Sequence, residues 1–271
     1  MAPTPFFEEH ENPPPSGRVD RFIRRFHGVS YALAVLAIYV LGAVALGLAL
    51  VPSLAIVARL APPLWGSGTQ WRWPALAALL AGAVFLWGFA LLVVVPALNF
   101  VLPTRLRPFR GGYFTVAAVP WYLHNGLFYL VRYTFLPFVS LTPMGTWFLR
   151  GMGMRIGRRV RITTEFFTDV SMMTVGDDSV IGGSATLFCH YGGGGHLVIA
   201  PVVIGRRVTI GERATIMGDV VIGDDARILA HAALLPGTRV GAGEVWGGAP
   251  ARRIPEDEWA RYKLETRGGT Q

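Results

Sequence analysis

A period of six residues in the second half of the chain constrains the possible folds more than any other feature. A large apolar side chain stands at every sixth position over this stretch: Ile204, Ile210, Ile216, Ile222, Ile228, Leu234, Val240 and Trp246. Glycine directly follows five of these residues, at positions 205, 211, 223, 241 and 247. An earlier register of the same kind contains Ile156, Ile162, Val175, Ile181 and Leu187. Repetition at a fixed period indicates stacked units that bury a common core.

The length of the period predicts what each unit looks like. Six residues accommodate one short strand and a tight turn, and three such units close a triangular coil. Stacked coils lie about 4.8 Å apart, which is the ordinary spacing of neighbouring strands. The large apolar residue points inward, and glycine tolerates the backbone angles of the turns. We therefore predict a parallel β-helix of roughly five coils over residues 156–249.

Two long uncharged segments dominate the first half of the chain. Residues 29–58 and 73–104 contain no Asp, Glu, Lys or Arg. Because roughly 20 apolar residues suffice to cross a bilayer, each segment predicts a transmembrane helix. Arginines lie outside the two segments, whereas the loop between them holds Arg72 alone, with Arg59 at its border; the outer arginines are Arg18, Arg21, Arg24, Arg25, Arg105, Arg107 and Arg110. The positive-inside rule then places both termini and the β-helix in the cytoplasm, at the cytoplasmic (inner) membrane.

The composition supports this division of the chain. Hydrophobic residues make up 52% of it and charged residues only 15%, against about a quarter charged in ordinary soluble domains. The net charge of +8 indicates contact with anionic lipid rather than with nucleic acid, because the arginines flank apolar runs.

The predicted segments are a disordered basic tail (1–27), two transmembrane helices (28–110), an aromatic-rich interfacial segment (111–150), a β-helix (151–252), and a C-terminal helix with its tail (253–271). The sequence leaves open whether residues 112–149 contain additional membrane-spanning segments.

The repeat resembles that of the hexapeptide-repeat acyltransferases, whose coils wind left-handed. The residues from Val245 to Arg252 are similar to the Gly-x-Pro-Ala segment that closes those helices. The resemblance implies an enzyme that moves an acyl group, with acetyl expected, from a coenzyme A or carrier-protein thioester to a hydroxyl or amine. It also implies a homotrimer with sites between neighbouring β-helices, and no metal.

A narrower resemblance concerns the junction between the two halves. The motifs Met144-Gly145-Thr146, Phe148-Leu149-Arg150-Gly151-Met152-Gly153 and Ile156-Gly157 are similar to membrane-associated units at the C-terminal ends of nonribosomal-peptide-synthetase-like enzymes. This chain has no adenylation or carrier domain. Whether it shares the reaction of those units is therefore open, and the resemblance implies, as one alternative, an amide-forming partner of such a system with a carrier protein as donor.

The repeat breaks between Leu187 and Ile204, which lie 17 residues apart where three units would need 18. The intervening residues include four consecutive glycines, at positions 192–195. Such a break predicts a loop extruded from the scaffold, and loops on rigid scaffolds often carry function. Related acetyltransferases have a histidine at the start of this loop and a Pro-x-x-Ile-Gly return, which His190 and Pro201–Gly205 match.

The resemblance assigns His190 as the general base. An imidazole suits that role because its unperturbed pKa lies near 6.5. Asp169 is the preferred carboxylate to orient the ring, and Glu165 is the alternative. By the same resemblance, Trp246, Gly247 and Arg252 are candidates to hold the pantetheine arm and phosphates of the donor, although a hydrophobic cap with a basic edge explains them equally well.

The remaining histidines and the single cysteine are expected to be structural. Neighbouring residues on a strand point to opposite faces, so Cys189 is predicted to be buried and not to pair with His190. His196 lies at the far end of the loop and is a weaker candidate base. His231 is expected at a coil corner, and His124 in a structural or lipid-facing position.

Three alternatives to the acyltransferase hypothesis stay open. A γ-type carbonic anhydrase shares the fold and needs three histidines on zinc; His190, His196 and His231 are available, but the spacing of the first two does not match that family. A non-catalytic trimeric scaffold at the membrane is the second alternative. The amide-forming partner described above is the third. The sequence does not identify the acceptor, which is either a small molecule or lipid-linked.

Overall fold

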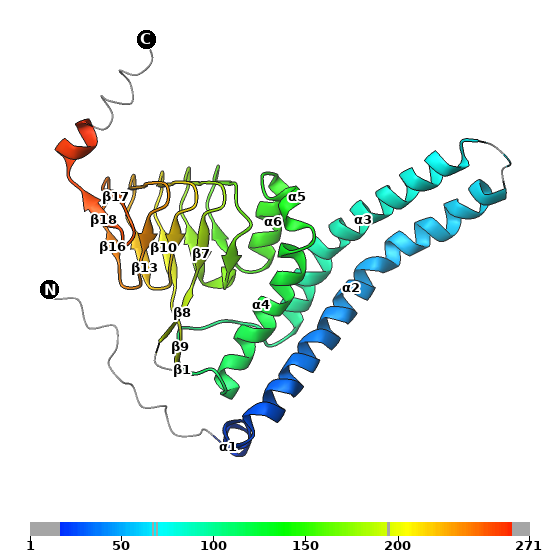
Figure 1. Cartoon of the computed structure of the whole chain (residues 1–271), viewed down its shortest axis with the longest axis horizontal. Helices are drawn as coiled ribbons and strands as arrows, with labels where there is room; N and C mark the ends of the chain where they lie inside the picture. The colour runs from blue at the N-terminus through cyan, green and yellow to red at the C-terminus, as the bar shows by residue number, and fades with distance from the viewer. Residues whose placement is uncertain (1–16, 67, 69, 194–195, 262–271) are drawn as a thin grey trace, which may run out of the picture.

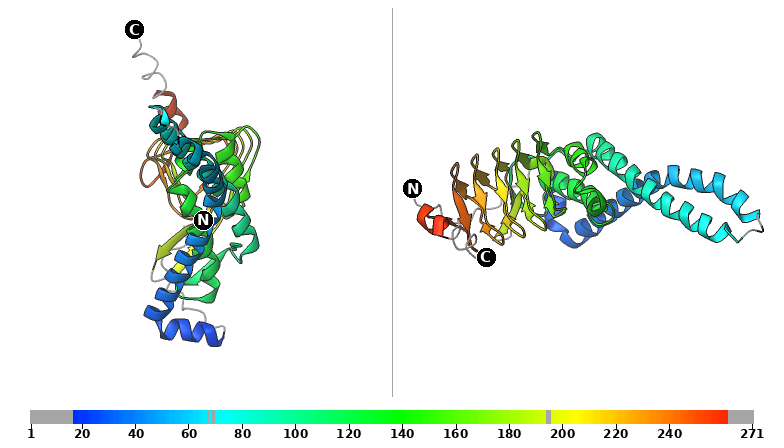
Figure 2. Two further views of the ribbon diagram at one scale, coloured as in Figure 1. Left: turned by 90° about the vertical axis from the view of Figure 1, so that its right-hand side faces the viewer. Right: turned by 90° about the horizontal axis from the view of Figure 1, so that it is seen from above.

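The computed structural model describes residues 17–261, except 67, 69, 194 and 195. A helical part is followed by a β-solenoid, and Figures 1 and 2 show the coils stacked in a row with a long helical hairpin projecting from one end. Residues 256–261 are helical beyond the last coil. The predicted order, two long apolar helices, a parallel β-helix and a short C-terminal helix, is confirmed.

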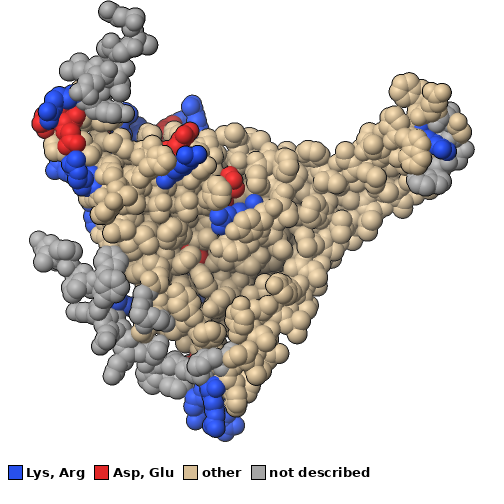
Figure 3. Space-filling view, in the orientation of Figure 1, with Lys and Arg blue, Asp and Glu red and all other residues tan. Residues whose placement is uncertain are grey.

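The projecting hairpin consists of two antiparallel helices, α2 (His27–Gly66) and α3 (Arg72–Val101). Both are long and apolar enough to cross a membrane, and most of their side chains are exposed. In Figure 3 the hairpin is free of charged residues between a basic group at its base and another at its tip. This surface has the character of one that faces lipid.

A short helix, α1 (Arg18–Arg25), precedes the hairpin. The sequence predicted a disordered tail over residues 1–27, and its second part is instead helical, while residues 1–16 lie outside the described residues. This helix contains arginines at positions 18, 21, 24 and 25 and exposed apolar side chains such as Val19 and Phe22 between them. This pattern is typical of a helix that lies in a membrane interface.

The aromatic segment forms a layer between the hairpin and the solenoid. Its elements are β1 (Phe109–Gly112), the 3₁₀ turn η1 (Val116–Ala118), α4 (Val119–Arg132), α5 (Leu136–Val139) and α6 (Pro143–Gly151). Phe135 packs against Gly88 of α3, where an added Cβ would lie 2.1 Å from the ring. Phe128 stacks on Phe148 with ring centroids 5.8 Å apart. At 14 residues, α4 is too short to span a bilayer.

The solenoid has three faces, each a sheet of parallel strands contributed by successive coils. The first face contains β2 (Arg155–Ile156), β5 (Met173–Val175), β10 (Val202–Ile204), β13 (Val220–Ile222) and β16 (Arg239–Val240). The second contains β3 (Arg161–Ile162), β6 (Val180–Ile181), β11 (Thr209–Ile210), β14 (Arg227–Ile228) and β17 (Val245–Gly247), with β18 (Arg252–Ile254) added antiparallel. The third contains β4 (Phe167–Thr168), β7 (Thr186–Phe188), β12 (Thr215–Ile216) and β15 (Ala233–Leu234).

The predicted apolar positions form the core. On the third face, Leu187, Ile216 and Leu234 are fully buried and lie in register from coil to coil. The first coil departs from the period, because Phe167 pairs with Leu187 and lies five residues after Ile162. The coils approach closely at their corners: a Cβ on Gly176 would lie 2.6 Å from the backbone of Gly205. Only glycine permits this approach without displacing the neighbouring coil.

Replacing one stacked core residue tests this packing. Ile210 is 1% exposed and lies between Ile181 and Ile228 in register. We expect Ile210→Ala to lower the free energy of unfolding by about 2–5 kcal/mol, because it removes buried methyl groups and leaves a cavity. Thermal or denaturant unfolding of the detergent-solubilised protein measures the change. The control is Thr209→Ala on the same strand, whose side chain is exposed; an equal loss in both variants would contradict the predicted core.

Candidate active site

The break in the repeat is a β-hairpin that leaves the solenoid after β7. Strands β8 (His190–Gly193) and β9 (His196–Ile199) pair antiparallel, and β9 also pairs with β1 from the first half of the chain. The predicted excursion is therefore present, but it is a hairpin within a three-stranded sheet. Two of the four loop glycines, Gly194 and Gly195, lie outside the described residues. The hairpin ties the second coil to the segment before α4.

His190 begins this hairpin and contacts Asp169 of the preceding coil. Both residues lie at the third corner of the solenoid, where the chain passes from the third face of one coil to the first face of the next. Nδ1 of His190 donates to Oδ2 of Asp169 at 2.6 Å. Asp169 adopts a left-handed conformation with φ of 56°, and aspartate is one of the few residues that adopts this conformation readily.

Asp169 is completely buried and accepts four further hydrogen bonds. Its Oδ1 accepts from Trp121 Nε1 and Asn125 Nδ2, both at 2.7 Å. Its Oδ2 accepts from Thr168 Oγ1 and from the backbone N–H of Cys189, both at 3.1 Å. Asn125 Oδ1 accepts in turn from the backbone N–H of Asp169 at 3.0 Å. The donors meet the requirement that a buried charge be fully hydrogen-bonded.

These contacts set the charge of Asp169 and the tautomer of His190. Burial acts to raise the pKa of Asp169, but the hydrogen bonds from His190, Asn125 and Thr168 outweigh it and hold the pKa below its ordinary value. An ionised carboxylate only accepts hydrogen bonds, so Nδ1 of His190 carries the proton. The lone pair of the neutral ring is then on Nε2. The ring is 27% exposed, and this arrangement is what a general base requires.

Two aromatic side chains flank the partly exposed ring. The indole of Trp121 meets His190 edge to face with centroids 5.2 Å apart, and Phe188 lies 5.6 Å away. These groups restrict the ring to a narrow range of orientations. Trp121 and Asn125 were not predicted as site residues, although their spacing of four residues puts both on one face of α4. The feature of the sequence that could have indicated this role is Asn125, a polar residue within an aromatic run.

The other candidates lie apart from this pair. Among the carboxylates in the described part of the chain, Asp169 and not the alternative Glu165 is the one that the structure pairs with His190. His196 pairs with Gly193 at the far end of the hairpin, and His231 occupies an exposed corner as predicted.

His124 is buried against Asn99 of α3 and does not face lipid, with 2.9 Å between His124 Nδ1 and Asn99 Oδ1. Burial lowers its pKa to about 4. Within the described ranges, no three His, Cys, Asp or Glu side chains gather to hold a metal ion.

The predicted donor-binding residues lie at the other end of the solenoid. Trp246 and Gly247 belong to β17 of the last coil, and Gly247 pairs with Arg252 of β18. Trp246 Nε1 donates to Glu244 at 2.9 Å, and Arg252 pairs with Glu258 at 3.1 Å. The coil of His190 is the second and that of Trp246 the fifth. One chain alone therefore does not bring these residues beside His190.

A known protein family has the same repeat. Residues 201–236 match the family described as bacterial transferase hexapeptide (six repeats). The solenoid is a hexapeptide-repeat β-helix. The chain is also 26% identical over 173 residues to the Delta-poly-L-ornithine synthetase of Acinetobacter baumannii, a match that covers 62% of this chain. The chain spans only 13% of the length of that relative.

Solved structures of acetyltransferases are similar to part of this chain. A hexapeptide-repeat acetyltransferase from Vibrio cholerae is 24% identical with a TM-score of 0.35, over 39% of this chain and 63% of that one. A galactoside acetyltransferase in complex with coenzyme A is 19% identical with a TM-score of 0.41, over 52% of this chain and 83% of that one.

The environment of Cys189 predicts its reactivity. Cys189 is the only cysteine of the chain and is fully buried, and burial raises the pKa of its thiol well above the ordinary value. We expect iodoacetamide at pH 8 to leave the folded protein unmodified, because the thiol stays protonated and inaccessible. Intact-mass spectrometry measures the modification, with the unfolded protein as the control that reacts fully. Rapid alkylation of the folded protein would contradict the burial of this side chain.

Proposed function

We propose that this protein is a membrane-anchored acyltransferase that uses His190 as its general base. The observation that carries the proposal is the buried Asp169 carboxylate, which accepts a hydrogen bond from Nδ1 of His190 and so leaves the basic lone pair on Nε2. The transferase-type repeat over residues 201–236 supports the same conclusion. Acyl transfer from a thioester needs a base at the acceptor and a rigid scaffold, and this site supplies both.

The proposed reaction is a direct transfer. Nε2 of His190 takes the proton from the hydroxyl or amine of the acceptor as its oxygen or nitrogen attacks the thioester carbonyl. The tetrahedral intermediate collapses, the carbon–sulfur bond breaks, and the thiolate leaves with the proton that Nε2 returns. Asp169 remains ionised and stabilises the imidazolium that exists between these steps.

The donor in this proposal is an acyl group, with acetyl expected, on coenzyme A or on a carrier protein. Trp246, Gly247 and Arg252 are the proposed contacts of its pantetheine arm and phosphates. Because these residues lie three coils from His190 in one chain, the proposal needs a homotrimer in which neighbouring β-helices complete each site. No step uses a metal.

The proposed acceptor is a small molecule or a lipid-linked group at the membrane surface. Asn125 and Trp121, which hold Asp169, belong to α4, and α4 packs on the hairpin through His124 and Asn99. The proposed location is the cytoplasmic (inner) membrane, with α2 and α3 crossing it and the β-helix and both termini in the cytoplasm. Similarity to Delta-poly-L-ornithine synthetase supports a second candidate, amide formation with an amine acceptor and a carrier-protein donor.

Loss of the base is the primary test. We expect His190→Ala to lower thiol release about 10²- to 10⁴-fold, the usual contribution of a general base. The assay offers a panel of acyl thioesters, free and carrier-bound, to the protein in membranes with a membrane extract as the source of acceptor. His231→Ala, at an exposed corner, is the matched control. Equal release by wild type and His190→Ala would reject the acyltransferase and favour a non-catalytic scaffold.

Loss of the orienting charge is the second test. Asp169→Asn should slow thiol release on the order of 10²-fold or more, because an amide no longer fixes the proton on Nδ1. Asp219→Asn is the control, since Asp219 also has a positive φ at the third corner but pairs with exposed Arg239. The double variant with His190→Ala should be no slower than His190→Ala alone, because the two residues act as one unit. Additive losses would show that Asp169 does not act through His190.

A further inference from the structure

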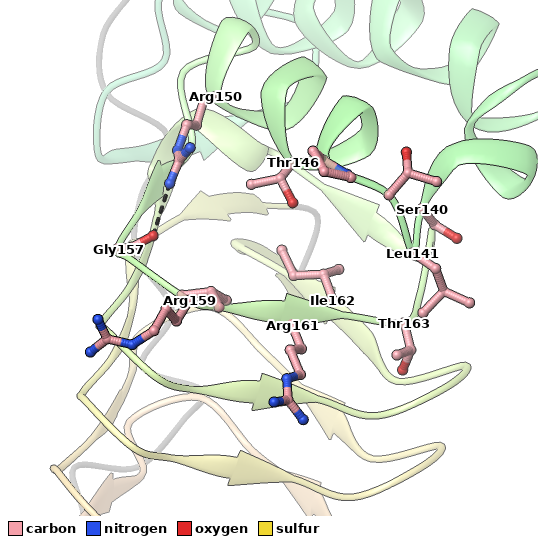
Figure 4. A pocket seen from close by; sticks show the side chains of 12 residues that line it. Ser140, Leu141, Thr146, Arg150, Gly157, Arg159, Arg161, Ile162 and Thr163 are labelled. Carbon is pink, nitrogen blue, oxygen red and sulfur yellow. Dashed lines mark hydrogen bonds between the residues drawn. The ribbon is translucent and has the colours of Figure 1, made fainter.

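A second site is indicated by a cavity that does not belong to His190. It has a volume of about 410 Å³ and lies between the α5–α6 segment and the first coil. Figure 4 shows Ser140, Leu141 and Thr146 on its helix side, and Arg161 and Thr163 on its coil side. Its coil residues belong to the second face of the solenoid, whereas His190 leaves the solenoid at the third corner. A volume of this size suits a small polar ligand.

The cavity is basic. Among the described residues that line it there is no Asp or Glu, and three arginines are present. Arg159 is paired with Asp178 at 2.6 Å. Asp178 does not line this cavity, but it lines an adjoining one together with Arg159 and Arg161. Arg150 is held by the backbone carbonyl oxygens of Ile156 and Gly157, at 3.0 and 2.8 Å, which fix its position without neutralising it. Arg161 is exposed and, within the part of the chain that the structure describes, has no carboxylate partner.

The rim beside these arginines is apolar and exposed. Leu141 lines the cavity and is 75% exposed. Phe138 of α5 and Trp147 of α6 are 67% and 53% exposed. Phe138 also packs edge to face on Phe85 of α3, with centroids 6.1 Å apart. Through Phe138, the exposed apolar residues next to the cavity contact α3 of the hairpin, at the end where the hairpin meets the solenoid (Figure 1).

We propose that this cavity binds the phosphate of an anionic phospholipid, whose acyl chains lie along α3, α5 and α6. Guanidinium groups pair with phosphate oxygens through charge-assisted hydrogen bonds. Basic pockets on the cytoplasmic side of membrane helices are suited to anionic headgroups. A cationic cavity that opens onto an apolar rim matches an amphiphile, whereas a soluble anion would use the charges alone. The site requires the hairpin to lie in a membrane but does not depend on the proposed acyl transfer.

Arg161 offers a clean substitution with a matched control. It is exposed, so Arg161→Gln should leave the fold and the basal thiol release unchanged. Arg161, Val180, Thr209 and Arg227 occupy one column of the second face in register. Arg227→Gln thus removes the same charge from the same face, three coils further from the membrane helices.

The experiment measures thermal unfolding of the detergent-solubilised full chain with three probes: dihexanoyl-phosphatidylglycerol, dihexanoyl-phosphatidylcholine and inorganic phosphate. We expect phosphatidylglycerol alone to raise the melting temperature of wild type and of Arg227→Gln. Arg161→Gln should bind phosphatidylglycerol about tenfold more weakly, a difference of about 1.4 kcal/mol.

Four outcomes would overturn the proposal. An equal shift with phosphatidylcholine would mean that the lipid charge is not recognised. An equal shift with inorganic phosphate would mean a site for a soluble anion. An unchanged phosphatidylglycerol shift in Arg161→Gln, or an equal loss in Arg227→Gln, would mean that the cavity is not the binding site.

Discussion

Stacking of successive coils at the spacing of neighbouring strands is the constraint on which the rest of the structure depends. Because the coils keep one register, residues at the same corner of consecutive coils lie within hydrogen-bonding distance although 18 to 21 positions separate them in the chain. Arg159 meets Asp178, and Arg207 meets Asp225, each at 2.6 Å. The pair of Asp169 and His190 follows the same geometry at a different corner. The candidate site is thus a specialised form of a contact that the solenoid makes repeatedly.

Burial distinguishes this pair from the others. The carboxylates of Asp178 and Asp225 are exposed, and exposed ion pairs contribute little to stability. Asp169 is inaccessible to water, so its charge requires donors on both oxygens. The solenoid supplies Thr168, His190 and the N–H of Cys189, while Trp121 and Asn125 come from α4. The helical layer therefore completes the electrostatic environment of the solenoid site.

This dependence connects the site to the helical half of the chain. On one side of α4, Asn125 is hydrogen-bonded to Asp169. On the other side, His124 is hydrogen-bonded to Asn99 of α3. Strand β1 joins the same layer to the hairpin of His190 through β9. Two independent connections thus hold the dyad at the end of the solenoid that meets the apolar helices. The basic cavity beside α6 lies at this end as well, on another face. In the proposed membrane-bound arrangement, an acceptor or lipid at the membrane surface would reach either place without entering the distal coils.

The sequence by itself determined the repetitive part of the architecture, because period and polarity are local properties. The six-residue spacing of apolar residues specified the strands, the inward positions and the excursion after Leu187, and uncharged length specified the two long helices. It left unassigned the position of Phe167, where the first coil departs from the period. Only the tertiary structure decided that Asp169 rather than Glu165 meets His190, and that Trp121 and Asn125 complete the carboxylate's shell. Those contacts join α4 to residues more than 40 positions away, and no spacing within a helix or a coil encodes how two such elements dock.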